Sequence, residues 1–160
     1  MELTDIMPVE NWRQLAEDIY NLFGFNGAVL DKNNMLVHSS TKWANDLCPV
    51  IRSGDNRIVC VSAQKRLSKV AEDEREPVID ECDAGFVKFV VPVFSGDEFL
   101  GTVSGCGCLL DNSEADAFYV SKLLNKEEEA IKVSLTTVHR VSKDRVKDAI
   151  KYVQQIINRH

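Results

Sequence analysis

The amino-acid sequence predicts an α+β domain with a PAS-like fold, built on an antiparallel sheet of about five strands. The predicted elements follow the order helix, two strands, helices, three strands, helices. The strand patterns fall into a hairpin at residues 26–39 and a meander at residues 77–109, which together supply five strands. An antiparallel sheet with inserted helices and with N- and C-terminal helices packed on it is the simplest structure that accommodates this order.

The first half of the chain supplies the hairpin and the inserted helices. Apolar residues at helical spacing predict an amphipathic helix over residues 8–23, and Gly24 is suited to end it. After the hairpin, residues 41–73 are expected to be helical in pieces, with interruptions at Pro49 and at residues 53–55.

The second half of the chain supplies the other three strands. Residues 77–79 form a short one, and residues 86–94 are almost continuously apolar, which predicts a strand covered on both faces. The last strand ends near residue 109, only helices are expected beyond it, and the closing helix spans residues 142–159. Because no linker or repeat divides the chain, residues 1–160 are predicted to form a single domain.

The composition limits the classes of function. With 19 basic and 25 acidic residues the net charge is −6, which argues against nucleic acid as a direct partner because such binding depends on clustered Lys and Arg. No apolar run approaches the roughly 20 residues that span a bilayer, and the first residues lack the basic and apolar regions of a signal peptide. We therefore expect a cytoplasmic protein with no membrane partner. Disulfides are disfavoured there, so the five cysteines need another explanation.

Five segments, in their order along the chain, resemble the PocR sensory domain family. They are Gly27-Ala28-Val29-Leu30-Asp31; Leu47-Cys48-Pro49-Val50-Ile51-Arg52 with Cys60; Cys82-Asp83-Ala84-Gly85-Phe86; Val91-Pro92-Val93 with Leu100-Gly101; and Val141 to Val146. The resemblance covers nearly the whole chain. It implies a PAS-like ligand-binding module of bacterial signalling proteins, usually joined to a DNA-binding, kinase or cyclase output domain. It also implies a small hydrocarbon derivative such as a diol as the ligand, and the family's cysteines imply a bound metal.

The chain departs from this family in two ways. It carries no output domain, so we expect either a fragment or a stand-alone sensor that acts on an unknown output protein. Where the family has glycine-glutamine after the last strand, this chain has Gly105-Cys106-Gly107-Cys108. The second departure favours a metal site over the diol ligand.

The cysteines are the leading candidates for metal ligands. Their spacing contains no C-x2-C pair, but dispersed ligands can converge in a folded domain; they are Cys48, Cys60, Cys82, Cys106 and Cys108. Because side chains alternate along a strand, Cys106 and Cys108 are expected on one face of the sheet, and Gly105 and Gly107 leave room there for a bulky group.

Thiolates hold iron–sulfur clusters, zinc or copper(I). An iron–sulfur cluster is favoured over structural zinc because zinc sites usually take paired knuckles. Haem is a third option, with a Cys or His38 as axial ligand. The alternative for all five cysteines is that they are reduced and buried, and act as small hydrophobic residues.

Two other functions are considered. One is a metal-free sensor whose small organic ligand lies in a PAS-like cavity, with His38 on a strand that can face it; the expected lining is Phe25, Val29, Phe89, Val91 and Val103. The other is an enzyme with a cysteine nucleophile, which is disfavoured because no convincing base or catalytic motif accompanies the cysteines. The prediction is therefore a sensor of a small-molecule or redox ligand, and not an enzyme.

The closing helix carries an apolar stripe at heptad-like spacing, formed by Val146, Ile150, Val153 and Ile157. The stripe can pack on the domain's own sheet, or it can serve as a homodimer surface or signalling helix. A two-fold dimer through this stripe is the prediction, because a self-complementary surface can serve both subunits.

Overall fold

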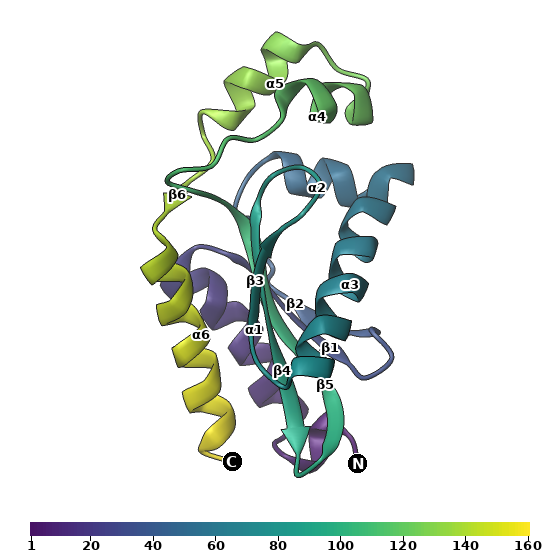
Figure 1. Ribbon diagram of the computed structural model, residues 1–160, viewed down its shortest axis with the longest axis vertical. Coiled ribbons are helices and arrows are strands. Elements are labelled where there is room, and N and C mark those ends of the chain that lie inside the picture. The colour runs from purple at the N-terminus through teal and green to yellow at the C-terminus, as the bar shows by residue number, and fades with distance from the viewer.

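The main sheet has the strand order β2-β1-β5-β4-β3 in the computed structural model, which describes residues 1–160 (Figure 1). The strands are β1 (Asn26–Asp31), β2 (Leu36–Ser39), β3 (Val78–Glu81), β4 (Val87–Ser95) and β5 (Glu98–Leu110). All their pairings are antiparallel, and β5 lies in the centre between β1 and β4. A sixth strand, β6 (Arg140–Val141), pairs in parallel with the end of β5. The predicted α+β fold with its hairpin and meander is confirmed.

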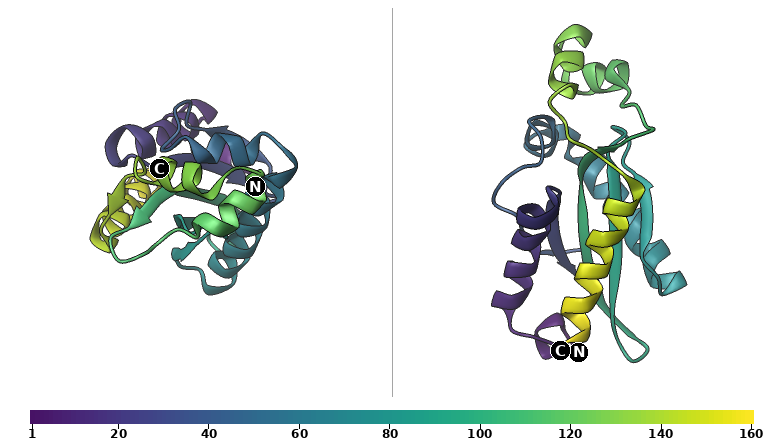
Figure 2. Two further views of the ribbon diagram at one scale, coloured as in Figure 1. Left: turned by 90° about the horizontal axis from the view of Figure 1, so that it is seen from above. Right: turned by 90° about the vertical axis from the view of Figure 1, so that its left-hand side faces the viewer.

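Helices cover both faces of this sheet (Figures 1 and 2). The terminal helices α1 (Val9–Phe23) and α6 (Lys143–Asn158) pack on one face, and α3 (Ile58–Glu74) packs on the other. The short helix α2 (Leu47–Arg52) precedes α3, while α4 (Ala117–Leu124) and α5 (Glu128–Leu135) form a lobe beyond one end of the sheet. Two 3-10 turns complete the chain, η1 (Leu3–Asp5) and η2 (Asp55–Arg57).

The sequence led us to expect that Pro49 would interrupt a helix. This expectation is wrong, because Pro49 lies in the first turn of α2. A proline is tolerated there since the first N–H groups of a helix have no partner within the helix. The expected break at residues 53–55 is real, because Ser53 ends α2 and a 3-10 turn begins at Asp55.

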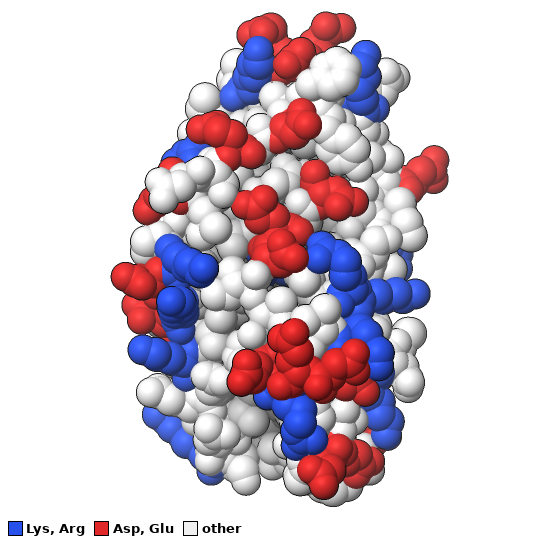
Figure 3. All heavy atoms as spheres, viewed as in Figure 1, with Lys and Arg blue, Asp and Glu red and all other residues white.

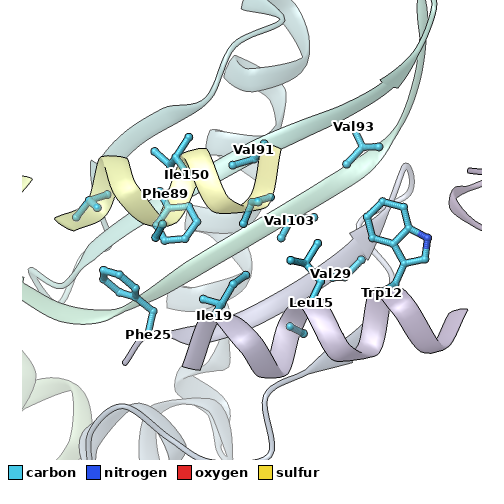
Figure 4. Close-up of a cluster of buried hydrophobic side chains, with 14 of the residues drawn as sticks. Trp12, Leu15, Ile19, Phe25, Val29, Phe89, Val91, Val93, Val103 and Ile150 are labelled. Atoms are coloured by element: carbon cyan, nitrogen blue, oxygen red, sulfur yellow. The ribbon is translucent and has the colours of Figure 1, made fainter. Parts of the chain in front are cut away.

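The main core lies between the sheet and the two terminal helices (Figure 4). Helix α1 contributes Trp12, whose indole Nε1 donates a hydrogen bond to the Leu3 carbonyl at 3.0 Å. Gly24 ends this helix in a left-handed conformation with φ of +82°, which glycine adopts without steric strain.

Helix α6 buries its apolar stripe in the same core. Val146 and Val153 are completely buried there, Ile150 is 7% exposed, and Ile157 is partly buried. The prediction that this stripe is a dimer surface is therefore wrong, because the stripe packs on the domain's own sheet. The possible homodimer through the terminal helices stays a prediction, without this stripe as its surface.

A second core lies where the sheet meets the α4–α5 lobe. It joins Cys48 and Ile51 of α2 and Val59 of α3 to Val120 and Ile131 of the lobe. Acidic and basic side chains are interspersed over the face of the molecule seen in Figure 3. None of the helices is both long and apolar enough to cross a lipid bilayer.

Candidate functional site

Four of the five cysteines come together beside the sheet from four different elements. They are Cys48 of α2, Cys60 of α3, Cys82 in the turn after β3, and Cys106 of β5, and we call them the thiol cluster. They are near enough that the charges of their thiolates act on one another in all six pairs. No three His, Cys, Asp or Glu side chains are close enough together to hold a metal ion as they stand. The thiols are therefore neighbours, but they do not form a ready ligand shell.

A β-bulge at Gly107 separates Cys106 from Cys108. Cys106 lies opposite Lys88 and Cys108 lies opposite Val87, so Gly107 has no partner on β4. Because Val87 and Lys88 are successive residues of a strand, they point to opposite faces of the sheet, and so do the two cysteines. The expectation that Cys106 and Cys108 share a face is wrong, because the bulge resets the alternation.

Cys108 belongs to the main core and not to the thiol cluster. It is 1% exposed and its Sγ donates to the Gly24 carbonyl at 3.5 Å. Burial and the nearby Cys106 raise its pKa to about 12, against the opposing charge of Arg145. Cys108 is thus the residue of the five whose environment matches that of a small hydrophobic side chain.

The room that Gly105 and Gly107 were expected to leave for a bulky group is taken by the chain itself. A Cβ on Gly107 would lie 2.5 Å from Asn26 Nδ2, and a Cβ on Gly105 would overlap the ring of Phe89. The φ of Gly107 is +96°, so glycine is required at the bulge for its backbone as well as for its size.

Two buried asparagines direct amide groups at the cluster. Asn45 Oδ1 accepts the backbone N–H groups of Leu47 and Cys48, each at 2.8 Å, which fixes the amide. Its Nδ2 then donates to Cys48 Sγ at 3.1 Å. Asn26 accepts from the Ala44 N–H at 2.7 Å and places Nδ2 3.9 Å from Cys106 Sγ. Hydrogen bonds to the charged form of a group favour that form, so these amides favour thiolates.

Burial is the main influence on the thiol pKa values. It raises the pKa of Cys48, Cys60 and Cys82 above the usual range, and the charge of Cys106 adds to the effect; the pKa of Cys60 reaches about 11. The Asn45 hydrogen bond opposes this rise at Cys48, and the positive charges of Arg52 and, to a smaller extent, Lys88 oppose it at Cys60. At Cys82 the backbone hydrogen bonds with Phe86 and Ala84 oppose it first, followed by the charge of Lys88. These three thiols are consequently protonated at neutral pH unless a cation replaces the protons.

Solvent reaches the cluster. Cys60, Cys82 and Cys106 are only partly buried, although Cys106 lies on the central strand of the sheet. Small molecules or ions of similar size to water can therefore approach three of the four thiols.

The residues expected to line a ligand cavity lie on the other face of the sheet. All are at most 2% exposed in the main core and share the face with α1 and α6 (Figure 4); they are Phe25, Val29, Phe89, Val91 and Val103. The rings of Phe25 and Phe89 pack edge to face with centroids 5.4 Å apart. A role of these side chains in ligand binding stays a prediction.

His38 takes part in a network with helix α1. It pairs with Val29 across β1 and β2, and its Nε2 lies 3.4 Å from Glu17 Oε2. Burial opposes the ionised form of Glu17, but hydrogen bonds from Thr41 and the contact with His38 outweigh burial and lower the Glu17 pKa. The structure brings His38 together with Glu17 and not with the thiol cluster. Its role as a haem ligand stays a prediction.

Sequence reasoning missed three residues of the site, namely Asn26, Asn45 and Lys88. Lys88 had a visible signal, because it is the only charged residue within the apolar run of residues 86–94. It lies opposite Cys106 and is 8% exposed. The asparagines had no such signal, since only the fold brings their amides to the cysteines.

The sheet order, with helices on both faces and an inserted pair of helices before β3, defines a PAS-like sensory domain. Comparison with known protein families matches residues 5–159 to the family described as the sensory domain found in PocR. The chain therefore belongs to the PocR sensory domain family, and it is a sensory ligand-binding domain. Comparisons with curated proteins and with solved structures find no match.

Proposed function

We propose that this sensory domain holds a soft metal centre through Cys48, Cys60, Cys82 and Cys106, and that it signals without catalysis. The observation that carries the proposal is the convergence of four thiols from four elements, with electrostatic interaction in every pair. Thiolate sets of this kind hold iron–sulfur clusters or zinc. An iron–sulfur cluster is favoured because the ligands come singly from separate elements, while zinc sites usually take paired ligands. Haem is the remaining alternative.

The donor set fits a soft metal in kind and number. Because no three of the thiols are close enough to share an ion as they stand, binding would have to draw them together. An iron–sulfur cluster would supply a one-electron redox change. The chain's own residues would then stabilise the thiolates: Asn26 and Asn45 donate to sulfur, and Lys88 offsets negative charge.

The thiol pKa values support signalling over catalysis. A nucleophilic cysteine is activated by a lowered pKa, whereas burial raises the pKa of Cys48, Cys60 and Cys82. The cysteine-nucleophile enzyme is therefore not proposed.

A metal-free sensor of a small organic ligand is the second candidate. It is favoured by the partial exposure of Cys60, Cys82 and Cys106 and by Lys88, which lies opposite Cys106 beside them. In this case the ligand would lie on the α3 face of the sheet, because the opposite face is closed by α1 and α6.

The experiment is metal analysis and visible absorption of the protein purified without oxygen. Replacing Cys48, Cys60, Cys82 or Cys106 singly with serine should each remove most of the bound metal, because ligation needs the full set. Cys108→Ser is the matched control and should keep wild-type metal content, since this cysteine faces the main core. A wild type without metal or absorption, or equal metal loss in all five variants, would show that the thiol cluster is not a metal site.

A further inference from the structure

A cavity of about 530 Å³ lies where α1 ends and α6 begins. The two helices run side by side in opposite directions, which brings these ends together (Figure 2). The cavity is lined by residues 20–24 at the end of α1, by Trp43 and Ala44 before α2, by residues 139–141 around β6, and by Arg145 in the first turn of α6. Its volume is in the range of small-molecule sites, and none of the cysteines lines it.

The polar groups around this cavity favour a negatively charged ligand. None of its lining residues is Asp or Glu, although the chain has 25 acidic residues against 19 basic ones. The guanidinium groups of Arg140 and Arg145 and the imidazole of His139 line it instead. A second cavity, of about 330 Å³ at the α4–α5 lobe, differs because it mixes lysines with Glu127 and Glu128. A cavity lined by one sign of charge attracts ligands of the opposite sign.

Arg145 has hydrogen-bond donors left for such a ligand. Its guanidinium lies 5.3 Å from the centre of the Phe23 ring, and its Nη2 donates to the Leu22 carbonyl at 3.0 Å. It forms no ion pair with a carboxylate of the chain. A guanidinium carries five N–H donors, so most of those of Arg145 are unused. Arg140 already donates to two carbonyl groups and to a carboxylate, and it adds mainly positive charge.

The apolar part of the lining favours a ligand with a flat ring. Tyr20, Phe23 and Trp43 contribute three aromatic side chains, and Leu22 lies among them. Trp43 is 40% exposed and Leu22 is 51% exposed, which is unusual for such large apolar side chains. Aromatic rings pack well against one another in offset or edge-to-face arrangements. A planar ring would therefore cover apolar surface that the chain itself leaves open.

We propose that this cavity binds a small aromatic carboxylate, with the carboxylate paired to Arg145 and the ring packed against Trp43. The guanidinium suits this group because two parallel N–H donors match the two oxygens of a carboxylate. Inorganic phosphate would meet the same guanidinium but would leave the aromatic surface open. The proposed metal centre lies elsewhere, so this inference does not depend on it.

The position of the cavity gives such a ligand a way to act on the rest of the domain. The Ala44 N–H donates to Asn26 Oδ1 at 2.7 Å, and Asn26 Nδ2 lies 3.9 Å from Cys106 Sγ. A ligand held between Trp43 and Arg145 would join this segment to α6. The cavity would thus serve as a second input, placed between the thiol cluster and the closing helix.

The test is a titration of the full chain with benzoate at constant ionic strength, followed by NMR of the backbone amides. Benzoate should shift the amides of residues 20–24, 43–44 and 139–145. Benzamide, which has the same shape without the charge, and inorganic phosphate, which has no ring, should each bind at least about tenfold more weakly. Arg145→Met should weaken benzoate binding by about 10- to 100-fold, and Trp43→Ala by about 3- to 10-fold.

Two controls make the result specific. Arg159→Met removes a guanidinium from the other end of α6, outside the cavity, and should leave benzoate binding unchanged. Cys106→Ser should remove metal and keep benzoate binding, so the two proposals can fail separately. The inference is overturned if benzamide binds as tightly as benzoate, if Arg145→Met weakens binding no more than Arg159→Met, or if benzoate and 2-naphthoate both fail to bind. A wild type that dimerises through Arg145 and binds neither acid would also overturn it, and would assign the cavity to a second copy of the chain.

Discussion

Replacing Gly107 with alanine should lower the free energy of unfolding by about 2–4 kcal/mol. The backbone contribution follows from a φ of +96°, which costs an L-residue about 1–2 kcal/mol. The packing contribution follows from the new Cβ, which would lie 2.5 Å from Asn26 Nδ2 and 3.1 Å from the Ala44 Cβ. Asn26 would have to move and weaken its contacts with the Ala44 N–H and Cys106 Sγ, at about 0.5–1.5 kcal/mol for a typical hydrogen bond.

Urea unfolding followed by circular dichroism measures this loss, and Gly96→Ala is the matched control. Gly96 also has a positive φ, of +58°, but a Cβ there would meet nothing within 4 Å. The control should therefore lose only about 1 kcal/mol, from the backbone alone. If Gly107→Ala is no less stable than Gly96→Ala, the close approach of Asn26 to the bulge does not hold this part of the structure.

Two further predictions concern the thiols and the closing helix. The free energy of unfolding should fall as pH rises from about 9 to about 11, because the Cys60 pKa is raised from 9.0 to about 11 and the thiol of the unfolded chain therefore loses its proton first. Urea titrations at pH 8, 9 and 10 should show a smaller fall in Cys60→Ser than in the wild type. If the free energy of unfolding depends on pH equally in both proteins, the raised pKa of Cys60 is contradicted. Changing Ile150 and Val153 together to Glu should unfold the domain, because both side chains lie in the main core; circular dichroism would detect this, whereas a folded double variant would place the stripe at the surface.

Periodicity was sufficient to predict the fold. The helix predicted over residues 8–23 corresponds to α1 at Val9–Phe23, and the hairpin and meander correspond to β1–β2 and β3–β5. Strand β6 had no signal, because two residues are too few for a pattern. The stripe of α6 had a signal with two meanings, since a helix that packs on its own sheet and one that packs on a second subunit show the same spacing.

The site was harder to predict because it depends on which way single residues face. Alternation assigned Cys106 and Cys108 to one face, and a one-residue bulge at Gly107 reversed the assignment for one of them. Alternation also separates Phe89 and Val91 from Lys88 and Val90, but it does not say which set faces the ligand side. The single lysine in an apolar strand was the informative residue, because Lys88 lies opposite Cys106 and so marks the face of β4 that is directed to the thiol cluster.

The central position of β5 has a consequence for how the chain folds. β5 pairs on one side with β4, its neighbour along the chain, and on the other side with β1, which is far from it in sequence. In the β1–β5 ladder, for example, Asn26 pairs with Cys106. Closing so long a loop is entropically unfavourable, so we expect the β1–β5 pairing to form late and to limit the folding rate. Until residues 98–110 have been synthesised, β1 and β4 each present an unpaired edge to other chains. A polypeptide that stops before β5 would therefore be prone to aggregate, although it already contains four of the five strands of the main sheet.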